Sequence, residues 1–513
     1  MPALLAGPLD DLARQMAARP EPPTGGAPLI AMHLAVLVSR LMPAVGWVAA
    51  ERHADGEQVW TGRSRPYDES TVRKRARDLA ARGGTELVAR AVEVSVEQAV
   101  PPSGTKVVAY TDMFDQVYWT KKPAYAAPIS NLGKRLLAAT YFGLTVIQVN
   151  ETIALAYHVS WHKPASPLHD ALEALHDAPR RATWLTQTVQ LHIWDRGGSG
   201  RPTLQWALAR RIPYLTVSQG STSWARYRRA PRVFTRSRVP VFVRRDVAVA
   251  RGAPRGSSPE VVVYPAHPER GRRATKALRY RCARPLPKPE LRALDRVYKS
   301  RWPSNENVIK ALVAIGFRRN LDRGLTPTTS RGTDGRAARL QVRQRVLDEK
   351  IAALRPTTIA WLIRQARPLA RECQKCAAER AQIAALPQDK GARMNEGAEL
   401  LCKNLMLLVY NRLKLLLAQS PSEEVRRMTP ARIQELLLGR QMLACPEGRV
   451  TTLWVDPPAS PPERALQEEL VRLLNGQALR LHGQELRIRL RTPDERAPQR
   501  QPDEPAGALR VSP

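Results

Sequence analysis

The stretch KVVAYTDMFDQVYW, residues 106–119, joins an apolar run to two acids. Val107–Tyr110 has the β-branched and aromatic composition of a buried strand, and Asp112 and Asp115 follow at its expected end. On a basic chain, acids at this place either pair with lysines at the surface or hold a metal ion beside an anionic substrate. The rest of the sequence bears on this choice.

The composition is that of a globular chain with a strong positive charge. Its 513 residues are enough for two to four domains, and 43% of them are hydrophobic. Lys and Arg number 81 against 47 Asp and Glu, which gives a net charge of +34. Such a charge attracts polyanions, so nucleic acid is the expected partner. A membrane surface is the weaker alternative, because the sequence has no lipidation motif.

The sequence favours a cytoplasmic protein without a membrane span. Residues 1–8 lack the basic and apolar regions of a signal peptide. The most apolar window, residues 29–50, contains His33, Arg40 and Pro43, and a charge at a bilayer centre costs about 2.5–3.5 kcal/mol. We therefore expect two buried helical segments around a break.

Cysteine usage agrees with a reducing compartment. Five cysteines are too few for a disulfide scaffold. Cys373 and Cys376 form a CxxC, but no second pair follows at the spacing of a zinc site. We therefore interpret them as two residues on one turn of a helix.

The first hundred residues are predicted to be a helical region for DNA binding or oligomerisation. Within it, residues 68–84 fit a helix with Ser70 as N-cap and a basic face. That face suits either a solvated surface helix or a helix that contacts DNA. Its apolar positions are Val72, Ala76, Leu79 and Ala80, and its basic ones are Arg73, Lys74, Arg75, Arg77 and Arg82.

The pattern changes near Thr105, where an α/β domain is predicted over residues 101–320. Apolar, β-branched runs alternate with shorter amphipathic segments, in the order of three strands, helix, strand, helix and strand. This order predicts a mixed sheet with helices on its faces. The predicted strands are 106–112, 135–149, 152–161, 189–195 and 212–217, and the helices are 166–178 and 200–211.

Residues 220–285 are predicted to be a basic β insertion in this domain. Residues 239–245 and 260–266 have strand composition, and Trp224 and Tyr227 lie among arginines. Arginine with aromatic residues suits phosphate contact and base stacking; the alternative is a poorly ordered basic loop. The arginines include Arg226, Arg228, Arg229, Arg236, Arg244, Arg245, Arg272 and Arg273.

The C-terminal half is predicted to be mostly helical. Helix returns at residues 289–317, and a loop is expected at 324–338 because of its Gly, Thr and Pro content. We predict a helical region over 321–420, a small α/β region over 421–496 and a disordered tail over 497–513. A long helix near residue 400 would place Leu401, Leu405, Leu408 and Leu415 in the core.

Three acids have positions that suit catalysis. Asp112 and Asp195 follow predicted strands, and Glu306 lies early in the helix after the insertion. Alone, each has an ordinary explanation, as a turn aspartate or a solvated helix acid. Carboxylates that meet at one point repel one another unless a cation is present, and Mg²⁺ prefers carboxylate and phosphate oxygens. Asp115 is the alternative to Asp112, but it would point to the opposite face if the strand continued.

The order YTDMFDQVYW, LHIWDRGGSG and YKSRWPSNENVIK resembles the DDE transposases of bacterial insertion sequences, over roughly residues 100–320. The family pattern has Asp, then Asp-Arg-Gly, then Tyr-x-x-Arg-Trp before Glu. Four residues separate Arg301 from Glu306 where the family has three, and Val313 stands where it has Lys, so Lys310 is the substitute. The matching residues are Asp112, Asp195, Arg196, Gly197, Tyr298, Arg301, Trp302 and Glu306.

The resemblance implies an RNase H-like catalytic domain in which Asp112, Asp195 and Glu306 bind two Mg²⁺ ions, with Mn²⁺ as a substitute. The expected reaction is strand cleavage at the ends of a mobile element and strand transfer into target DNA, by a homodimer on double-stranded DNA in the prokaryotic nucleoid. Open alternatives are an RNase H-like nuclease that does not join strands and a non-catalytic DNA-binding protein. The residues expected to contact DNA are Arg196, Tyr298, Arg301, Lys310, Lys121, Lys122, Arg228, Arg229, Arg244 and Arg245.

Overall fold

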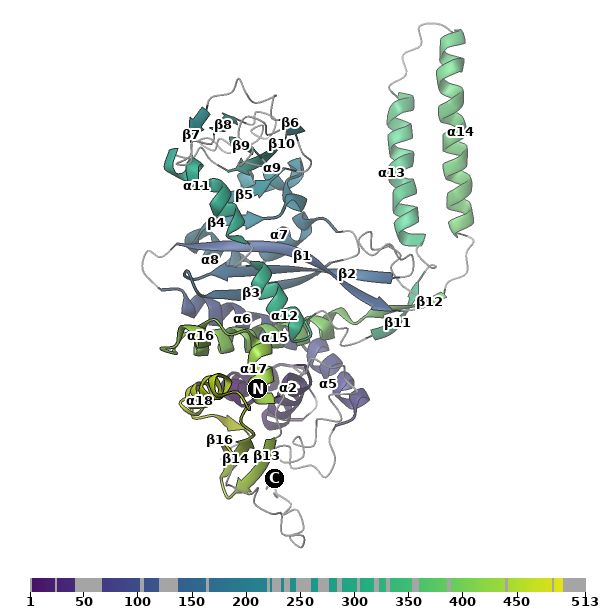
Figure 1. The fold of residues 1–513 in the computed structure, drawn as a ribbon. Coiled ribbons are helices and arrows are strands. Elements are labelled where there is room, and N and C mark those ends of the chain that lie inside the picture. The colour runs from purple at the N-terminus through teal and green to yellow at the C-terminus, as the bar shows by residue number, and fades with distance from the viewer. Residues whose placement is uncertain are drawn as a thin grey trace.

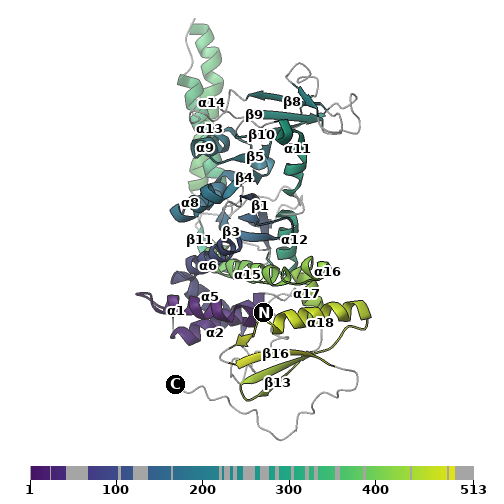
Figure 2. The same cartoon turned by 90° about the vertical axis from the view of Figure 1, so that its left-hand side faces the viewer.

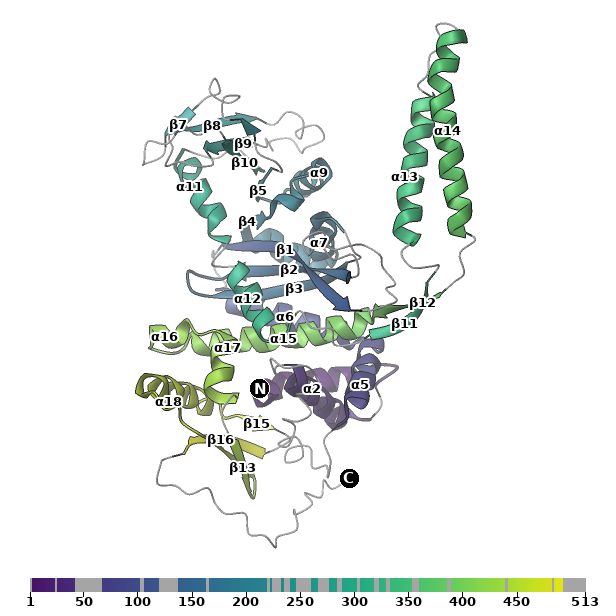
Figure 3. The same ribbon diagram turned by 45° about the vertical axis from the view of Figure 1, so that its right-hand side comes forward.

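The computed structural model has a large sheet at its centre (Figure 1). N-terminal helices and a C-terminal α/β unit lie together beyond one edge of this sheet, and a long helical hairpin stands apart from the rest (Figures 1 and 3). The described residues are 2–23, 25–41, 67–101, 106–119, 137–162, 166–218, 222–223, 232–234, 240–245, 260–265, 276–283, 288–301, 305–317, 323–328, 333–352, 359–384, 389–438, 442–481 and 484–491.

The central sheet is mixed and has ten strands, in the order β3-β2-β1-β4-β5-β10-β9-β8-β7, with β6 paired to β10. Neighbouring strands run parallel in the pairs β1–β4 and β4–β5 and antiparallel elsewhere. The α/β class and the mixed sheet with flanking helices are therefore confirmed. The strands are β1 (Val107–Trp119), β2 (Leu137–Gln148), β3 (Ala154–His162), β4 (Val189–Trp194), β5 (Tyr214–Val217), β6 (Thr222–Ser223), β7 (Arg232–Phe234), β8 (Pro240–Arg245), β9 (Glu260–Pro265) and β10 (Lys276–Cys282).

Strand β1 is longer than the sequence prediction. It pairs with β2 along its whole length, from Val108 to Trp119, so the backbone stays extended past the acids. Asp112 therefore lies in the middle of the strand, and the prediction that the strand ends there is wrong. What ends near Asp112 is the pairing with β4, whose last matched pair is Thr111 with Trp194.

The two faces of β1 meet different helices. Side chains alternate along a strand. Ala109 belongs to a core cluster with residues of α6, α7 and α8, whereas Tyr110 packs with residues of α11. Figure 2 shows α8 and α9 on one side of the sheet and α11 and α12 on the other. These helices are α6 (Gly84–Ala99), α7 (Leu168–Leu175), α8 (Pro179–Thr188), α9 (Arg201–Ala209), α11 (Lys288–Lys299) and α12 (Asn307–Ala314), with a 3₁₀ turn at Arg196–Gly198.

Helix α15 (Glu396–Leu417) packs between β3 and the N-terminal helices (Figures 1 and 3). Leu401, Leu405 and Leu408 are buried as predicted, and Leu415 is half-buried. The side chain of Asn411 accepts a hydrogen bond from the Ala156 amide and donates one to its carbonyl, which covers the edge strand β3. The N-terminal helices are Pro2–Leu5, α1 (Ala6–Ala17), α2 (Ala27–Leu41) and α5 (Glu69–Ala81).

Helix α5 begins two residues earlier than the sequence suggests. Its N-cap is Asp68, which accepts a hydrogen bond from the Thr71 amide, and the Ser70 hydroxyl donates to the same carboxylate. The predicted cap at Ser70 is therefore wrong, because the acid before it already binds the free amide. Val72 and Leu79 are buried on the inner face, as predicted.

A hairpin and a second α/β unit complete the chain. The loop expected at 324–338 is wrong, since β11 and the start of α13 form there and β11 pairs with β12. Cys373 and Cys376 lie on one turn of α14, as expected. The remaining elements are β11 (Arg323–Thr328), α13 (Thr333–Ala352), α14 (Ile359–Ala384), β12 (Asp389–Met394), α16 (Glu423–Arg426), α17 (Pro430–Ile433), a π-helical turn (Gln434–Leu438), β13 (Met442–Glu447), β14 (Val450–Val455), α18 (Pro461–Asn475), β15 (Arg480–Leu481) and β16 (Gln484–Leu490).

In the described parts of the chain, every helix is too short or too polar to cross a bilayer. Helix α2 covers the first part of the apolar window and is mostly buried against other helices. Residues 42–66, and with them the second expected helical segment, lie outside the described residues. The tail from residue 497 lies outside them too.

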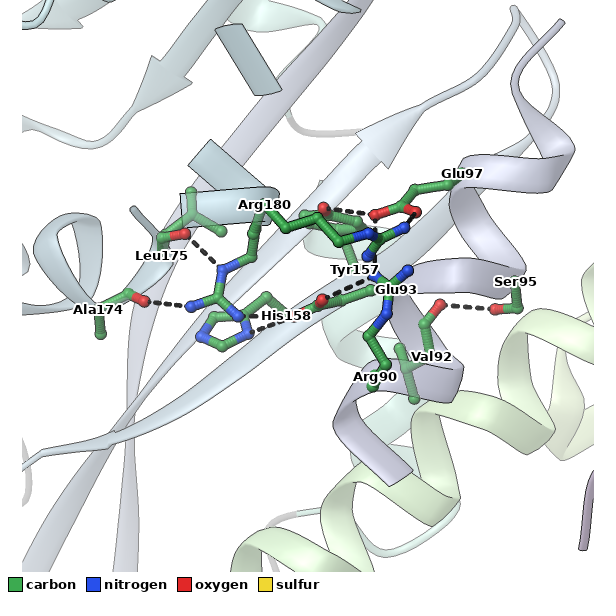
Figure 4. A network of polar contacts seen from close by, with 11 residues as sticks. Arg90, Val92, Glu93, Ser95, Glu97, Tyr157, His158, Ala174, Leu175 and Arg180 are labelled. Carbon is green, nitrogen blue, oxygen red and sulfur yellow. Dashed lines mark hydrogen bonds and ion pairs between the residues drawn. The ribbon is translucent and has the colours of Figure 1, made fainter. Parts of the chain in front are cut away.

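A buried polar network joins α6 to strand β3 and to helices α7 and α8 (Figure 4). Its centre is Arg181, which donates to Glu93 Oε1 at 2.6 Å and to the carbonyls of Leu175 and Ala174 at 2.5 and 2.7 Å. His158 Nδ1 lies 3.8 Å from the same Glu93 oxygen. Burial of these groups is tolerated because the guanidinium nitrogens all have acceptors.

Candidate active site

Asp112 and Asp195 are neighbours because of the register of two parallel strands. Thr111 of β1 is matched with Trp194 at the end of β4, so the next residue of each segment is an acid. The Asp195 carbonyl accepts a hydrogen bond from the Thr216 hydroxyl of β5 at 3.1 Å, which fixes the backbone at this point. The carboxyl ends of parallel strands are where ligand sites of α/β sheets commonly form.

Glu306 reaches the same place from a helix. Asp112 and Tyr110 lie on the same face of β1, the face that α11 covers. Helix α11 ends at Lys299, and Glu306 is the residue directly before α12. The two helices therefore bring Tyr298, Arg301 and Glu306 over the strand ends.

Arg301 lies between the three acids. Its Nη1 is 3.4 Å from Asp112 Oδ2 and 3.5 Å from Asp195 Oδ1, and its Nη2 is 3.7 Å from Glu306 Oε1. The Arg301 side chain is only 8% exposed, whereas that of Asp195 is 38% exposed. The cluster is thus closed on the arginine side and open to solvent on the Asp195 side.

Tyr298 forms one wall of the cluster. Its ring lies 5.7 Å from the Arg301 guanidinium carbon, and its hydroxyl is 3.5 Å from Asp195 Oδ1. Burial, together with the nearby acids, raises the pKa of Tyr298 to about 12, so the phenol remains a hydrogen-bond donor. The last turn of α11 and the residues directly after it therefore present an aromatic ring and a guanidinium to the same carboxylates.

The cluster carries more negative than positive charge. Burial raises the pKa of Asp112 to about 6, and the charges of Asp195 and Glu306 add to this effect, while Arg301 opposes it. Three carboxylates share one guanidinium at distances longer than normal hydrogen bonds. This electrostatic imbalance favours the entry of a further cation.

Beneath the cluster, on the opposite face of the sheet, hydrogen-bonded side chains form a floor that the sequence prediction lacks. The Thr111 hydroxyl contacts Thr145 Oγ1 at 2.8 Å and His192 Nε2 at 2.7 Å, and all three residues are buried. Tyr110 and Ser300 make a similar contact at 3.1 Å between β1 and the end of α11. In the sequence, the signal for such a floor is a polar residue at a strand position that would otherwise be apolar, because a buried polar group needs a hydrogen-bond partner.

The donor set suits a hard metal ion, although its present arrangement does not form a closed cage. Among the described residues, no group of three His, Cys, Asp or Glu side chains is arranged to hold a metal. The guanidinium of Arg301 lies among the carboxylates instead. Three carboxylates with a surplus of negative charge are nevertheless the ligands that Mg²⁺ prefers, so the residues fit the ion in their chemistry.

The residues predicted to contact DNA divide into four groups. Tyr298 and Arg301 lie in the cluster itself. Arg196 and Lys310 are exposed, next to Asp195 and one turn beyond Glu306, so the structure brings them to the rim of the site. Arg244 and Arg245 lie in β8, five strands from β1, which is roughly 24 Å at about 4.8 Å per strand. Lys121, Lys122, Arg228 and Arg229 lie outside the described residues, as does Trp302 of the family pattern.

Asp115 shares strand β1 with Asp112, but its side chain lies outside the described residues. The preference for Asp112 therefore rests on its contact with Arg301 and its place beside Asp195. A scan against protein-family models and a search of curated proteins find no match to this chain. The site geometry is consequently the basis for a functional proposal.

Proposed function

We propose that the protein is a DNA transposase of the DDE type, which cleaves DNA strands at the ends of a mobile element and joins them to target DNA. The observation that carries this proposal is the convergence of Asp112, Asp195 and Glu306 on one point from two parallel strands and a following helix. Convergence of acids that lie 83 and 111 residues apart is what the sequence resemblance requires.

The order of the first five strands supports the RNase H-like class. Strands β3, β2 and β1 are antiparallel neighbours, and β4 and β5 continue the sheet in parallel with β1. This is the arrangement that the resemblance implies for the catalytic domain. The antiparallel strands β10, β9, β8 and β7 extend the sheet beyond β5. Along the chain they lie between β5 and α11, where the sequence predicts the basic insertion.

In this mechanism the three acids would hold two Mg²⁺ ions. Their chemistry there would be activation of a water or a 3′-hydroxyl and stabilisation of the leaving oxygen of an in-line displacement. Arg301 compensates the carboxylate charge before DNA binds and then contacts a phosphate near the scissile bond. Tyr298 limits the path of Arg301 and orients it toward the acids, while Arg196 and Lys310 attract the phosphate backbone.

The proposal places the substrate on the exposed side of the cluster. Asp195 is the most exposed of the three acids, and Arg196 follows it directly. A phosphate that enters there meets Asp195 first, because Asp112 and Glu306 are more buried. Double-stranded DNA is the proposed partner, because the net charge of +34 favours a polyanion. A homodimer is proposed because both ends of an element must be held together.

The test is metal-dependent cleavage and joining of labelled DNA that carries the sequences flanking the gene. Purified protein is incubated with Mg²⁺ or with EDTA, beside the Asp195→Asn variant. Nicks at the element ends and joined products, both lost in EDTA and in the variant, are the expected result. Cleavage without joining would favour a nuclease, and salt-sensitive binding without cleavage would indicate a DNA-binding protein. Intact cleavage by Asp195→Asn would rule out the proposed role of the acids.

A further inference from the structure

Lys403 is a fully buried lysine in the middle of α15, on the side that faces the catalytic sheet. Its side chain and that of Glu399, one turn earlier, are both 0% exposed, and Nζ lies 3.7 Å from Glu399 Oε2. The same Nζ donates a hydrogen bond of 2.5 Å to the carbonyl oxygen of Phe317. Burial of an ammonium group is unfavourable, and it lowers the pKa of Lys403. A methionine would fill a similar volume without this cost, so the charge and the donor need a reason.

The hydrogen bond joins α15 to the end of the helix that Glu306 precedes. Helix α12 ends at Ala314, and the Phe317 amide donates back to the Leu312 carbonyl, which closes the C-terminal turn. A lysine at this end satisfies a carbonyl that has no partner within the helix and complements the negative end of the helix dipole. Figure 3 shows α12 in front of the sheet, with its lower end at α15.

Aromatic contacts join the same ammonium group to the strand of Asp112. Lys403 Nζ lies 4.6 Å from the ring centre of Phe142 and 4.9 Å from that of Phe317. Phe114, two residues after Asp112, lies 5.8 Å from Phe142 and 5.4 Å from Phe317 between ring centres. Cation–π attraction is strongest where the cation is desolvated, as it is here.

The contacts converge on two catalytic elements at once. Phe114 is on β1, on the same strand face as Asp112, and Phe317 follows α12, which Glu306 directly precedes. In the part of the chain that the structure describes, Lys403 contacts Glu399, Phe142 and Phe317 rather than the three acids. Its effect on the site would therefore come from setting where β1 and α12 stand relative to each other.

We propose that Lys403 is a positioning residue that fixes the Glu306 helix against the Asp112 strand, so that the two carboxylates can bind metal together. This inference rests on the proposed function, because it assigns Lys403 a task only if the acids bind metal. Supporting groups outside the ligand set commonly change metal affinity or activity by about 10- to 100-fold when they are removed.

The test compares Lys403→Met with a matched control on the same helix. Lys414 is half-buried and donates to two carbonyls, of Arg426 and Met428, but these belong to the C-terminal part of the chain. We expect Lys403→Met to raise the Mg²⁺ concentration for half-maximal cleavage about tenfold or more, with DNA affinity unchanged. Lys414→Met is expected to leave both values as they are.

A second readout does not depend on activity. Amide hydrogen exchange of residues 306–317 is expected to be about tenfold faster in Lys403→Met than in the wild type and in Lys414→Met, because α12 loses its anchor. Unchanged exchange and unchanged Mg²⁺ dependence would overturn the inference. If exchange is faster in Lys403→Met but the wild type cleaves no DNA, then Lys403 anchors α12 and the proposed function is wrong. The failure of the inference and the failure of the proposed function are therefore distinguishable.

Lys403→Gln serves if the methionine variant does not fold, because it keeps a donor for the Phe317 carbonyl and removes only the charge. We expect it to shift the Mg²⁺ dependence and the exchange of α12 in the same direction as Lys403→Met, by a smaller factor. Wild-type behaviour of Lys403→Gln in both measurements would show that the cation–π contacts have no positioning role, and would overturn the proposal in this form.

Discussion

Arg181 and Arg301 are both buried arginines beside acids, yet their surroundings differ. The Arg181 side chain is 10% exposed and that of Arg301 is 8% exposed. Arg181 makes three hydrogen bonds of 2.5–2.7 Å, to one carboxylate and two carbonyls (Figure 4). Arg301 has no carboxylate closer than 3.4 Å, and within the described residues its Nε has no hydrogen-bond partner.

The difference distinguishes a structural network from a site that is prepared for a ligand. The acceptors around Arg181 match its donors, so a further ion would gain nothing there. Around Arg301 the acids outnumber the bases three to one, and all contacts are loose. Such a cluster gains free energy when a cation enters or when the arginine turns to a phosphate.

The largest expected effect on stability is at the Arg181 network. Replacing Glu93 with Ala leaves the Arg181 guanidinium buried without its carboxylate, which we expect to lower the free energy of unfolding by about 3–5 kcal/mol. The measurement is urea unfolding, and the free energy is taken from the first unfolding transition. The double variant Glu93→Ala/Arg181→Met should recover part of the loss. A cost below about 1 kcal/mol in the single variant would mean that the network is not structural.

The matching change at the open cluster should affect activity instead. Glu306→Gln removes one carboxylate charge from three, and we expect DNA cleavage to fall by about 100- to 1000-fold. The free energy of unfolding should stay within about 1 kcal/mol of the wild type, since Arg301 keeps two acids. Glu290→Gln, at an exposed acid in the first turn of α11, is the control and should cleave normally.

The sequence predicts much of the acid cluster around Arg301 but nothing of the Arg181 network. Asp112 and Asp195 each follow an apolar strand segment, and a parallel arrangement of these segments predicts that the two acids meet where the pairing ends. The central place of Arg301 depends on distances that a sequence does not contain. The Arg181 network joins residues 88 positions apart, Glu93 and Arg181, and no local pattern marks either as the partner of the other.

The same limit applies to the fold. Strong apolar runs predict the strands β2 and β3 near their observed bounds. The sequence prediction lacks β10, although Leu278, Tyr280 and Cys282 alternate with polar residues there, because its arginines resemble the basic loop around it. The length of β1 was set by its pairing with β2, a tertiary effect that outweighs local polarity.

A third prediction concerns the floor of the open cluster. Burial lowers the pKa of His192 to about 3, below the ordinary value of about 6.5. The unfolded chain therefore binds a proton at this residue that the folded chain does not, and stability falls as the pH drops below about 6.5. At pH 5 the expected loss is about 2 kcal/mol, because one pKa unit corresponds to about 1.4 kcal/mol.

The measurement is urea unfolding at pH 8 and pH 5, for the wild type and for His192→Gln. The variant keeps a hydrogen-bonding group for Thr111 but does not titrate. We expect its difference between the two pH values to be about 2 kcal/mol smaller than that of the wild type, whatever its absolute stability. An equal pH dependence in the two proteins would mean that His192 is not held neutral, and that the floor is less rigid than the Arg181 network.

The smallest expected effect has the opposite sign to that of the Arg181 network. The pKa of Asp112 is raised to about 6, so the stabilising contribution of its protonated form is present below about pH 4 and is lost as the pH rises through 6. Asp112→Asn removes this penalty. In EDTA at pH 8 we expect the variant to be about 1–2 kcal/mol more stable than the wild type, and nearly equal to it at pH 4.

The expected gain in stability is smaller than the free energy that corresponds to the whole pKa shift of Asp112. The reasons are that the Asp112 side chain is 22% exposed and that Arg301 loses one of its three acids in the variant. Added Mg²⁺ should reverse the order at pH 8, since only the wild type can bind the ion with all three carboxylates. If Asp112→Asn is instead destabilised at pH 8 without metal, as Glu93→Ala is expected to be, then Asp112 and Arg301 form a structural pair. The surplus charge would then be compensated within the chain, and the cluster would have no reason to bind a metal.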